Sequence, residues 1–221
     1  MGLRRRIATT FAATAAAAGM AISVAAPATA LSKDETNSFL SQLTASYSPT
    51  GDNNPYDFDI VTRAAMDTGA TATLAKLDAF TLFAPNDRAF EVLANDLGLL
   101  GKNYRFGATV NEDKVYKALL TIDDAVPTIT EILLYHVLPG AKVTGEQVLS
   151  GPFTQRLTMA NGEKLRVTVL SRSAKFPVIV LGDKDGKFFN DLVVKSKIDV
   201  IKTDNTVVHG ISDVLLPDLK N

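Results

Sequence analysis

The spacing of hydrophobic residues along the chain changes near residue 139. Up to that point, apolar residues recur every three or four positions, which is typical of helices with one buried face. The clearest such face consists of Ile129, Ile132, Leu133, His136 and Val137. Beyond it, apolar and polar residues alternate in 156–159 and 164–169, on either side of an Asn-Gly pair that favours a hairpin turn. The pattern predicts an α+β domain in which an antiparallel sheet packs against helices.

The helix that carries this face has boundary signals at both ends. Thr128 and Glu131 have the spacing of a capping box, and the pair Pro139-Gly140 cannot continue a helix. His136 lies on the apolar stripe, where a polar ring needs hydrogen-bond partners. We expect it to be structural, buried and neutral at pH 7. Tyr135 falls off the stripe, which predicts that its amphipathic ring lies at the domain surface or at an interface.

Turn-forming residues separate the other elements. A helix is expected from Asp59 to a cap at Gly69, and a short strand ends at Pro85. Asn86 or Asp87 then caps a second helix, because Asx residues at a strand-to-helix turn are capping residues more often than ligands. A loop rich in Gly and Asn at 98–111 precedes a helical stretch at 113–120. Further strands are expected at 178–181, 193–201 and 206–212.

Residues 1–30 have the pattern of an export signal. A basic start, Arg4 to Arg6, is followed by an Ala-rich apolar run, and Ala28 and Ala30 form a small-x-small cleavage site. The general secretory and the twin-arginine routes both fit. A membrane anchor is the alternative, which the weak hydrophobicity of the run disfavours. We expect a secreted protein without a stable membrane anchor after cleavage, in which 31–55 form an N-terminal helix and linker, 56–217 the domain and 218–221 a tail.

The composition excludes several classes of chemistry. The chain has no cysteine and only two histidines, His136 and His209, among 221 residues. It therefore lacks a thiol nucleophile, thiolate ligands and a zinc-ligand set. No nucleophile elbow or nucleotide-binding motif occurs, and the loop 182–186 lacks the carboxylate spacing of a calcium loop. The formal net charge of −1, or −4 once Arg4 to Arg6 are removed, gives no reason to expect nucleic acid. We predict no catalytic residue, cofactor or metal site, and no enzyme.

Three motifs in order across residues 56–217 carry a family resemblance. Residues 81–90, TLFAPNDRAF, resemble the first signature of fasciclin domains; Leu134 to Val137 resemble their tyrosine–histidine motif; and residues 205–217, NTVVHGISDVLLP, resemble their second signature. Thr206 stands where the family usually has glycine, and Gly210 where it has a larger apolar residue. The resemblance implies a β-sandwich or wedge of mostly antiparallel strands with helices at its side. It also makes Asn86, Asp87 and His209 parts of structural motifs.

The resemblance further implies adhesion as the function. Fasciclin adhesion is linked to the tyrosine–histidine region and to an Asp-Ile type pair, so Tyr135, His136 and Asp199 form a possible adhesion surface, with the loop 98–111 as the alternative. The expected partner is an extracellular protein or a cell-surface component. A second hypothesis is an extracellular carrier that holds a small apolar ligand between helix and sheet, which requires a large closed apolar pocket.

Overall fold

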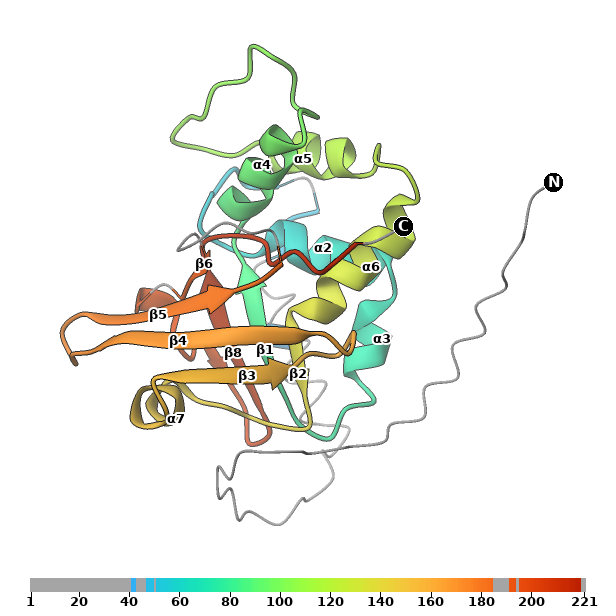
Figure 1. The fold of residues 1–221 in the computed structure, drawn as a ribbon. Coiled ribbons are helices and arrows are strands. Elements are labelled where there is room, and N and C mark those ends of the chain that lie inside the picture. The colour runs from blue at the N-terminus through green and yellow to red at the C-terminus, as the bar shows by residue number, and fades with distance from the viewer. Residues whose placement is uncertain (1–40, 43–46, 50, 185–190, 194, 220–221) are drawn as a thin grey trace.

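Helices dominate the first half of the folded chain and strands the second half in the computed structural model (Figure 1). The structure describes residues 41–42, 47–49, 51–184, 191–193 and 195–219, so the predicted signal peptide and most of the predicted N-terminal helix lie outside the described residues. The helices are α2 (Asp59–Asp67), α3 (Ala70–Leu74), α4 (Asp87–Asp96), α5 (Glu112–Leu119), α6 (Ala125–Tyr135), α7 (Gly145–Ser150) and the 3-10 helix η1 (Lys195–Lys197). The strands are β1 (Phe80–Pro85), β2 (Val137–Pro139), β3 (Thr154–Thr158), β4 (Lys164–Arg172), β5 (Pro177–Gly182), β6 (Asp191–Leu192), β7 (Ile201–Lys202) and β8 (Thr206–Ile211).

The strands form two four-stranded sheets. Sheet A has the order β2-β1-β8-β7, and sheet B has the order β3-β4-β5-β6. All pairs are antiparallel except β1 with β8, which run parallel from Phe80 opposite Thr206 to Pro85 opposite Ile211. A single bridge between Val193 and Ile211 links the segment after β6 to β8. The predicted α+β class with mostly antiparallel strands is confirmed.

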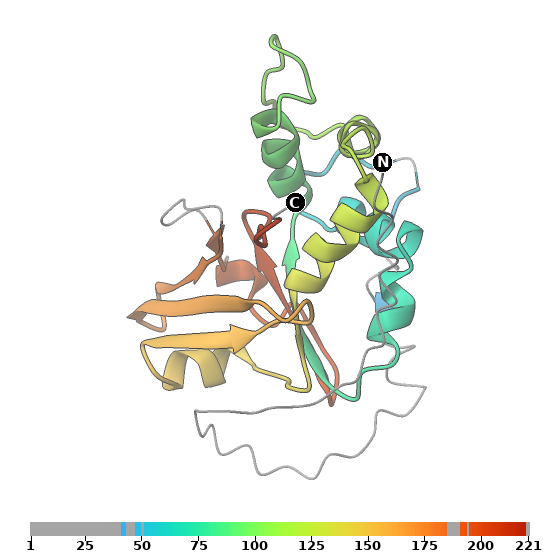
Figure 2. The ribbon, with the colours of Figure 1, turned by 45° about the vertical axis from the view of Figure 1, so that its right-hand side comes forward.

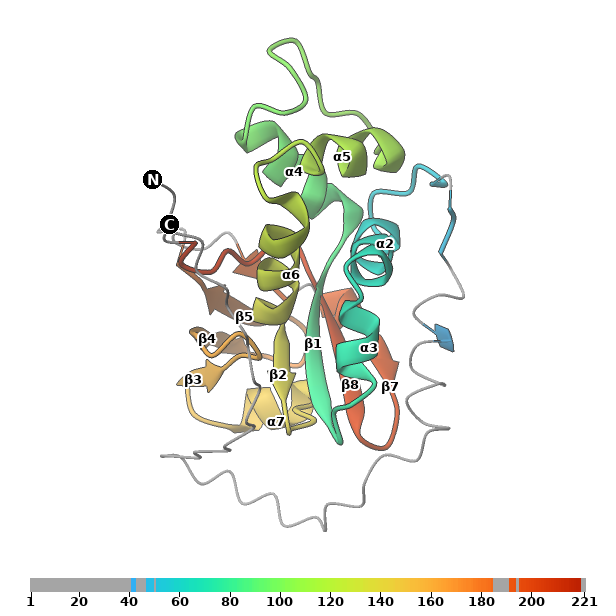
Figure 3. The ribbon, with the colours of Figure 1, turned by 90° about the vertical axis from the view of Figure 1, so that its right-hand side faces the viewer.

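Two hydrophobic cores hold these layers together. One lies between sheet A and the helices α2 to α6, several of which cover that sheet in Figure 3. The other lies where the two sheets meet and contains Phe83, Met159, Leu165 and Leu215. The strands of sheet B cross those of sheet A in clearly different directions (Figures 1 and 2). Because the sheets of an aligned sandwich keep their strands within about 30° of each other, the arrangement is a wedge rather than an aligned β-sandwich.

Helix α6 begins earlier than its sequence signals indicate. Its N-cap is Asp124 with φ of 50°, so the predicted capping box of Thr128 and Glu131 is wrong. Pro127 fits inside the first turn because the N–H groups there have no intrahelical partner. A capping box is found instead at the start of α7, where Thr144 and Gln147 exchange hydrogen bonds.

The predicted strand 193–201 is also wrong. Val193 makes one isolated bridge, residues 195–197 form η1, and strand β7 starts only at Ile201. Asp199 has φ of 53°, which turns the chain out of the extended conformation before β7. The hairpin around Asn161-Gly162 forms as predicted, with β3 and β4 paired from Thr158–Lys164 to Thr154–Thr168.

Candidate functional site

Tyr135 is buried inside the domain and is not a surface residue. Its side chain has 0% exposure, belongs to the core between the sheets, and donates a hydrogen bond from its hydroxyl to Lys164 O at 3.1 Å. The prediction that its ring lies at the surface is wrong. Strand β2 begins two residues after Tyr135 and pairs with β1, so the end of α6 is packed against the helix–sheet core on one side and the core between the sheets on the other.

His136 is also fully buried, as predicted. Its Nδ1 lies 2.8 Å from Ile132 O, and its Nε2 accepts a hydrogen bond of 2.9 Å from Leu215 N. These partners define a neutral ring protonated on Nδ1. Burial lowers the pKa of His136 to about 4, against the weaker raising effect of the Ile132 carbonyl. The ring is a structural link and has no surface to offer to a partner.

Asp199 and His209 together hold the start of α7. Asp199 Oδ1 accepts a hydrogen bond of 2.9 Å from Gly145 N, and Asp199 N donates to His209 Nδ1 at 3.2 Å. His209 Nε2 lies 2.8 Å from Val143 O, and burial lowers the pKa of this ring. Asp199 keeps 25% of its side chain exposed. Its carboxylate is nevertheless engaged with α7, so its contacts point to a role in the fold.

Asn86 and Asp87 cap two different helices. Asn86 accepts a hydrogen bond of 2.9 Å from Ala89 N and caps α4, as predicted. Asp87 is the first residue of α4, yet its carboxyl accepts hydrogen bonds from Ile60 N at 2.8 Å and from Asp59 N at 3.3 Å. It therefore supplies the cap that α2 lacks, because the N-cap residue of α2 is Phe58.

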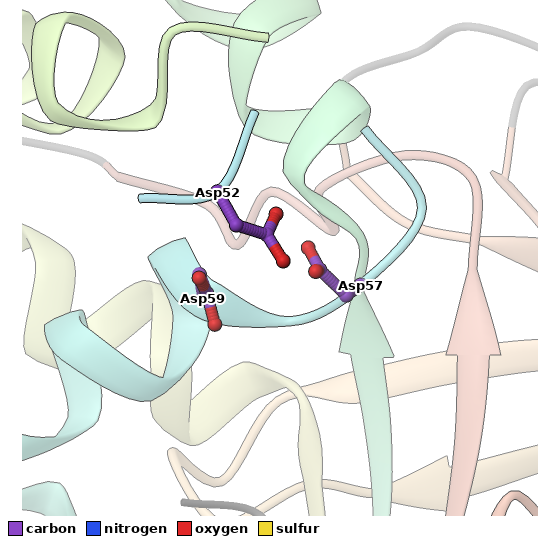
Figure 4. Close-up of side chains that lie close together, drawn as sticks. All are labelled: Asp52, Asp57 and Asp59. Atoms are coloured by element: carbon purple, nitrogen blue, oxygen red, sulfur yellow. The ribbon is translucent and has the colours of Figure 1, made fainter. Parts of the chain in front are cut away.

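Asp87 belongs to an acidic cluster of five carboxyl groups: Asp52, Asp57, Asp59, Asp87 and Glu112. Three of these residues, Asp59, Asp87 and Glu112, are the first residues of α2, α4 and α5, so three helix N-termini converge there. The positive ends of the helix dipoles favour acidic side chains at such positions. Figure 4 shows the carboxylates of Asp52 and Asp57 facing one another, with Asp59 beside them.

Backbone N–H groups hold the carboxyl groups of the acidic cluster in place. Asp52 N donates to Glu112 Oε2 at 2.8 Å, and Ser48 N donates to Asp59 Oδ2 at 3.1 Å. Gly51 lies so close that a Cβ there would overlap Glu112 Oε2. The second oxygens of two of the buried carboxyl groups, Asp59 Oδ1 and Glu112 Oε1, have no hydrogen-bond partner. The chain segment around Gly51, which the sequence assigned to a linker, is thus fastened to the domain.

Burial raises the pKa values of three carboxyl groups of the acidic cluster, those of Asp59, Asp87 and Glu112. The pKa of Asp87 rises to about 9, first through burial and then through a hydrogen bond with Asp57. The pKa of Asp59 rises to about 6 and that of Glu112 to about 7, in both cases mainly through burial. Beside the cluster lies a cavity of about 10 Å³ lined by residues that include Tyr47, Asp59, Glu112 and Tyr116.

A sequence signal for the acidic cluster does exist. Asp52, Asn54, Asp57 and Asp59 place four oxygen-bearing side chains within eight residues, a density typical of loops that bind hard cations. The boundary expected between a linker at 31–55 and the domain at 56–217 divides this stretch, so the four residues were not grouped. The contributions of Asp87 and Glu112 come from distant segments and leave no local pattern.

A second feature is the outer face of sheet B, which is cationic. On β3 and β4 the residues of the outer face, exposed except for the half-buried Thr168, pair directly across the two strands: Thr154 with Thr168, Arg156 with Arg166, and Thr158 with Lys164. Lys164 Nζ donates to the Thr158 hydroxyl. Among the described residues, neither Arg156 nor Arg166 meets a carboxylate. We call these six residues the cationic face.

An exposed hydrophobic group borders the cationic face at the β4–β5 hairpin. Phe153, Leu170 and Phe176 are 63%, 52% and 64% exposed. The guanidinium of Arg172 lies 3.9 Å from the centre of the Phe153 ring, and Lys175 Nζ lies 5.4 Å from the centre of the Phe176 ring. The hairpin projects from the body of the domain in Figure 1, so cations and apolar rings are presented together.

These observations define an α+β domain of two crossed sheets with flanking helices and an exposed polar sheet face. The family model for the Fasciclin domain matches residues 56–217, and the chain belongs to the fasciclin domain family. In fold it is similar to the FAS1 domain pair of the insect cell adhesion molecule fasciclin I, with 16% identity and a TM-score of 0.44. The similarity covers 83% of this chain and 46% of that one. No curated protein matches the sequence. Each helix among the described residues is too short or too polar to traverse a bilayer.

Proposed function

We propose that the protein is a secreted, non-enzymatic adhesion module that binds an anionic polymer of a cell surface or extracellular matrix through its cationic face. Membership of the fasciclin family supports adhesion in general, because fasciclin domains are typically extracellular or cell-surface modules. The observation that carries the choice of surface is the pair Arg156 and Arg166, which stand directly opposite each other without a carboxylate among the described residues.

Charge complementarity selects the partner. Like charges directly opposite each other on a sheet are destabilising, and an anionic group bound between the two guanidinium groups would relieve that repulsion. The planar guanidinium fork matches the geometry of carboxylate and phosphate oxygens. The hydroxyl groups of Thr154 and Thr168 add neutral hydrogen-bonding positions on the same face. A flexible polymer with regularly spaced anionic groups can occupy such a row.

The hydrophobic group at the hairpin extends this surface. Phe153 and Phe176 offer apolar ring faces beside Arg172 and Lys175, which suits the apolar faces of sugar rings as well as their anionic substituents. A single shallow contact of this kind binds weakly. Several copies presented together raise avidity by about 10² to 10⁴, so we expect adhesion that depends on surface density.

The cationic face is also favoured because the three adhesion residues inferred from the sequence are engaged inside the domain. Tyr135 and His136 have no exposed side-chain surface, and the Asp199 carboxylate is bound to α7. The carrier hypothesis is not supported either. An apolar ligand site needs a cavity of about 300 to 1,000 Å³, whereas the cavity beside the acidic cluster has about 10 Å³ and is lined by residues that include Asp59, Arg63 and Glu112.

Binding to dextran sulfate, with uncharged dextran as the reference, tests the proposal. The protein is immobilised at high and at low density, and retention of the fluorescent polymers is measured at about 0.05 and 0.5 M salt, because exposed charge pairs are screened as salt rises. The double variant Arg156→Glu/Arg166→Glu is compared with Lys76→Glu/Lys102→Glu. The control pair is exposed, lies outside sheet B, and changes the net charge equally.

We expect retention of dextran sulfate at high density and low salt, loss of at least tenfold in the arginine variant, and little change in the lysine variant. Equal losses in the two variants would show that only net charge matters and would contradict the cationic face. Retention of neither polymer under any condition would contradict an anionic partner.

A further inference from the structure

The acidic cluster has the composition of a site for a hard cation and lies apart from the cationic face. Asp52, Asp57 and Asp59 each offer a carboxylate oxygen, and these atoms lie within 4.8 Å of one another. Asp57, Asp87 and Glu112 form a second such group, so Asp57 is shared. Two ligands on opposite sides of a calcium ion are about 5 Å apart, because each Ca–O distance is about 2.3 to 2.6 Å. The observed spacing therefore suits an ion between the carboxylates.

The unpartnered oxygens are the second, independent observation. Asp59 is 3% exposed and Glu112 is 5% exposed, and each has one buried carboxyl oxygen without a hydrogen-bond partner. A buried polar atom left unpaired is costly, and native structures contain few of them. The other oxygen of each group is held by a backbone N–H, from Ser48 and Asp52 respectively. Both carboxyl groups are thus fixed in position with one oxygen available.

No side-chain cation among the described residues neutralises this cluster. Arg63, which lines the neighbouring cavity, pairs with Asp67 and Asp113 and stacks over the Tyr116 ring. Three helix N-termini contribute only partial positive charge, about half an elementary charge each, against the carboxyl groups of Asp52, Asp57, Asp59 and Glu112. A divalent cation would supply both the missing charge and the missing partners.

We propose that the acidic cluster is a calcium-binding site, with Asp52, Asp57 and Asp59 as ligands and Glu112 as a further oxygen donor. Asp52 is exposed, Asp57 is half-buried and Asp59 is buried, so the group of three carboxyl groups extends from the surface into the domain. Asp87 stays with the backbone of α2, whose N–H groups occupy its oxygens. The candidate ligands are all oxygens and include four carboxyl groups, which suits the six to eight oxygen ligands of calcium better than a magnesium site, which usually has only one or two carboxylates.

Bound calcium would fasten residues 51–58 to the starts of α2 and α5. Sites in extracellular modules bind calcium with dissociation constants of about 10⁻⁴ to 10⁻³ M, and we expect this range. A ligand that binds only the folded state stabilises it by RT ln(1 + [L]/Kd), so the melting temperature rises with the ligand concentration. The proposal therefore predicts a melting temperature several degrees higher in 10 mM CaCl₂ than in chelator.

Three metal probes test the site on the purified protein after chelation. Thermal melting is followed with CaCl₂ and with MgCl₂ at equal concentrations, and binding of TbCl₃ is followed by terbium emission on tyrosine excitation. The chain has no tryptophan, and Tyr47 and Tyr116 line the adjoining cavity. The variants are Asp57→Asn and Asp59→Asn. The control is Asp113→Asn, which lines the same cavity but lies outside the cluster.

We expect the effect of Asp59→Asn on the melting temperature to change sign when calcium is added. In chelator the variant should melt at or above the wild-type temperature, because an unpaired buried charge is gone. In calcium the variant should melt below the wild-type temperature, because a ligand of the ion is lost. Asp57→Asn should weaken terbium binding at least tenfold and Asp113→Asn less than twofold. A wild-type melting temperature that calcium leaves unchanged, an equal shift with magnesium, or equal losses in Asp57→Asn and Asp113→Asn would each overturn the proposal.

Discussion

Leu215 N donates a hydrogen bond of 2.9 Å to His136 Nε2, across 79 residues of sequence. The other ring nitrogen, Nδ1, lies 2.8 Å from Ile132 O in the last turn of α6. One imidazole therefore ties the end of α6 to the C-terminal segment that follows β8. Because the ring is completely buried, both hydrogen bonds are shielded from water. If the ring is removed, water cannot take its place as the hydrogen-bond partner of Leu215 N or Ile132 O.

Replacing His136 by Ala should destabilise the domain. The variant loses the packing of the ring and leaves Leu215 N–H unpaired, at a cost of roughly 1 to 3 kcal/mol in the free energy of unfolding. Urea denaturation measures this. Val126→Ala, a 51% exposed position on the same helix, is the control and should change stability by less than about 0.5 kcal/mol. A stable His136→Ala variant that loses polymer binding would contradict the structural role.

The effect of His136→Ala should depend on pH. Burial holds the folded-state pKa of His136 at about 4, below its ordinary value of 6.5. Between these values the unfolded chain binds more protons, so the contribution of His136 to stability is lost as the pH falls from 6.5 to 4. The difference in unfolding free energy between wild type and variant should narrow by about 2 kcal/mol from pH 7 to pH 4.5. A difference that stays constant would mean that the ring takes up a proton in the folded state as readily as in the unfolded chain.

Asn86→Ala and Asp87→Ala should loosen different helices although the residues are adjacent. Asn86 caps α4, whereas Asp87 accepts from Ile60 N and Asp59 N at the start of α2. Each substitution should cost about 1 to 2 kcal/mol. Hydrogen exchange distinguishes them: the amide of Ile60 should exchange faster in Asp87→Ala, and that of Ala89 in Asn86→Ala. Faster exchange at the same amides in the two variants would contradict this assignment.

Gly210→Ala should destabilise the protein through a steric clash. A Cβ at this position in β8 would lie 2.6 Å from Lys197 Cβ and 3.2 Å from Phe58 Cζ. We expect a loss of roughly 1 to 3 kcal/mol, as for other overpacked sites. Gly107→Ala is the matched control, because the nearest atom to its Cβ would be Thr109 O at 3.7 Å. Equal melting temperatures of the two variants would contradict the close approach of η1 to β8.

Tyr135→Ala should destabilise the protein while leaving the binding of correctly folded molecules intact. Loss of the ring creates a cavity between the sheets at a cost of about 3 to 5 kcal/mol, whereas Tyr135→Phe removes only the hydrogen bond to Lys164 O at about 1 kcal/mol. Dextran sulfate retention per folded molecule of Tyr135→Phe should equal that of wild type. If Tyr135→Phe retained less dextran sulfate at unchanged stability, Tyr135 would be a contact residue after all.

The sequence by itself determined the features that depend on neighbouring residues. The alternation around Asn161-Gly162 predicted the β3–β4 hairpin, and the helical stripe predicted a buried His136. An Asx residue at a strand-to-helix turn predicted Asn86 as the cap of α4, and the succession of helical and extended patterns predicted the α+β class. These features extend over about ten residues, within which helical and extended periods determine which side chains share a face.

Only the tertiary structure decided the features that join distant segments. Tyr135 lies off the apolar stripe, yet its ring is buried in the core between the two sheets, because sheet B packs against this side of the end of α6. Asp87 caps a helix that begins 28 positions earlier in the chain, at Asp59. The acidic cluster exists because three helices start at one place, and strands β1 and β8 pair although more than 100 residues separate them. Spacing along the chain specifies which face a side chain occupies, whereas the path of the whole chain decides what that face meets.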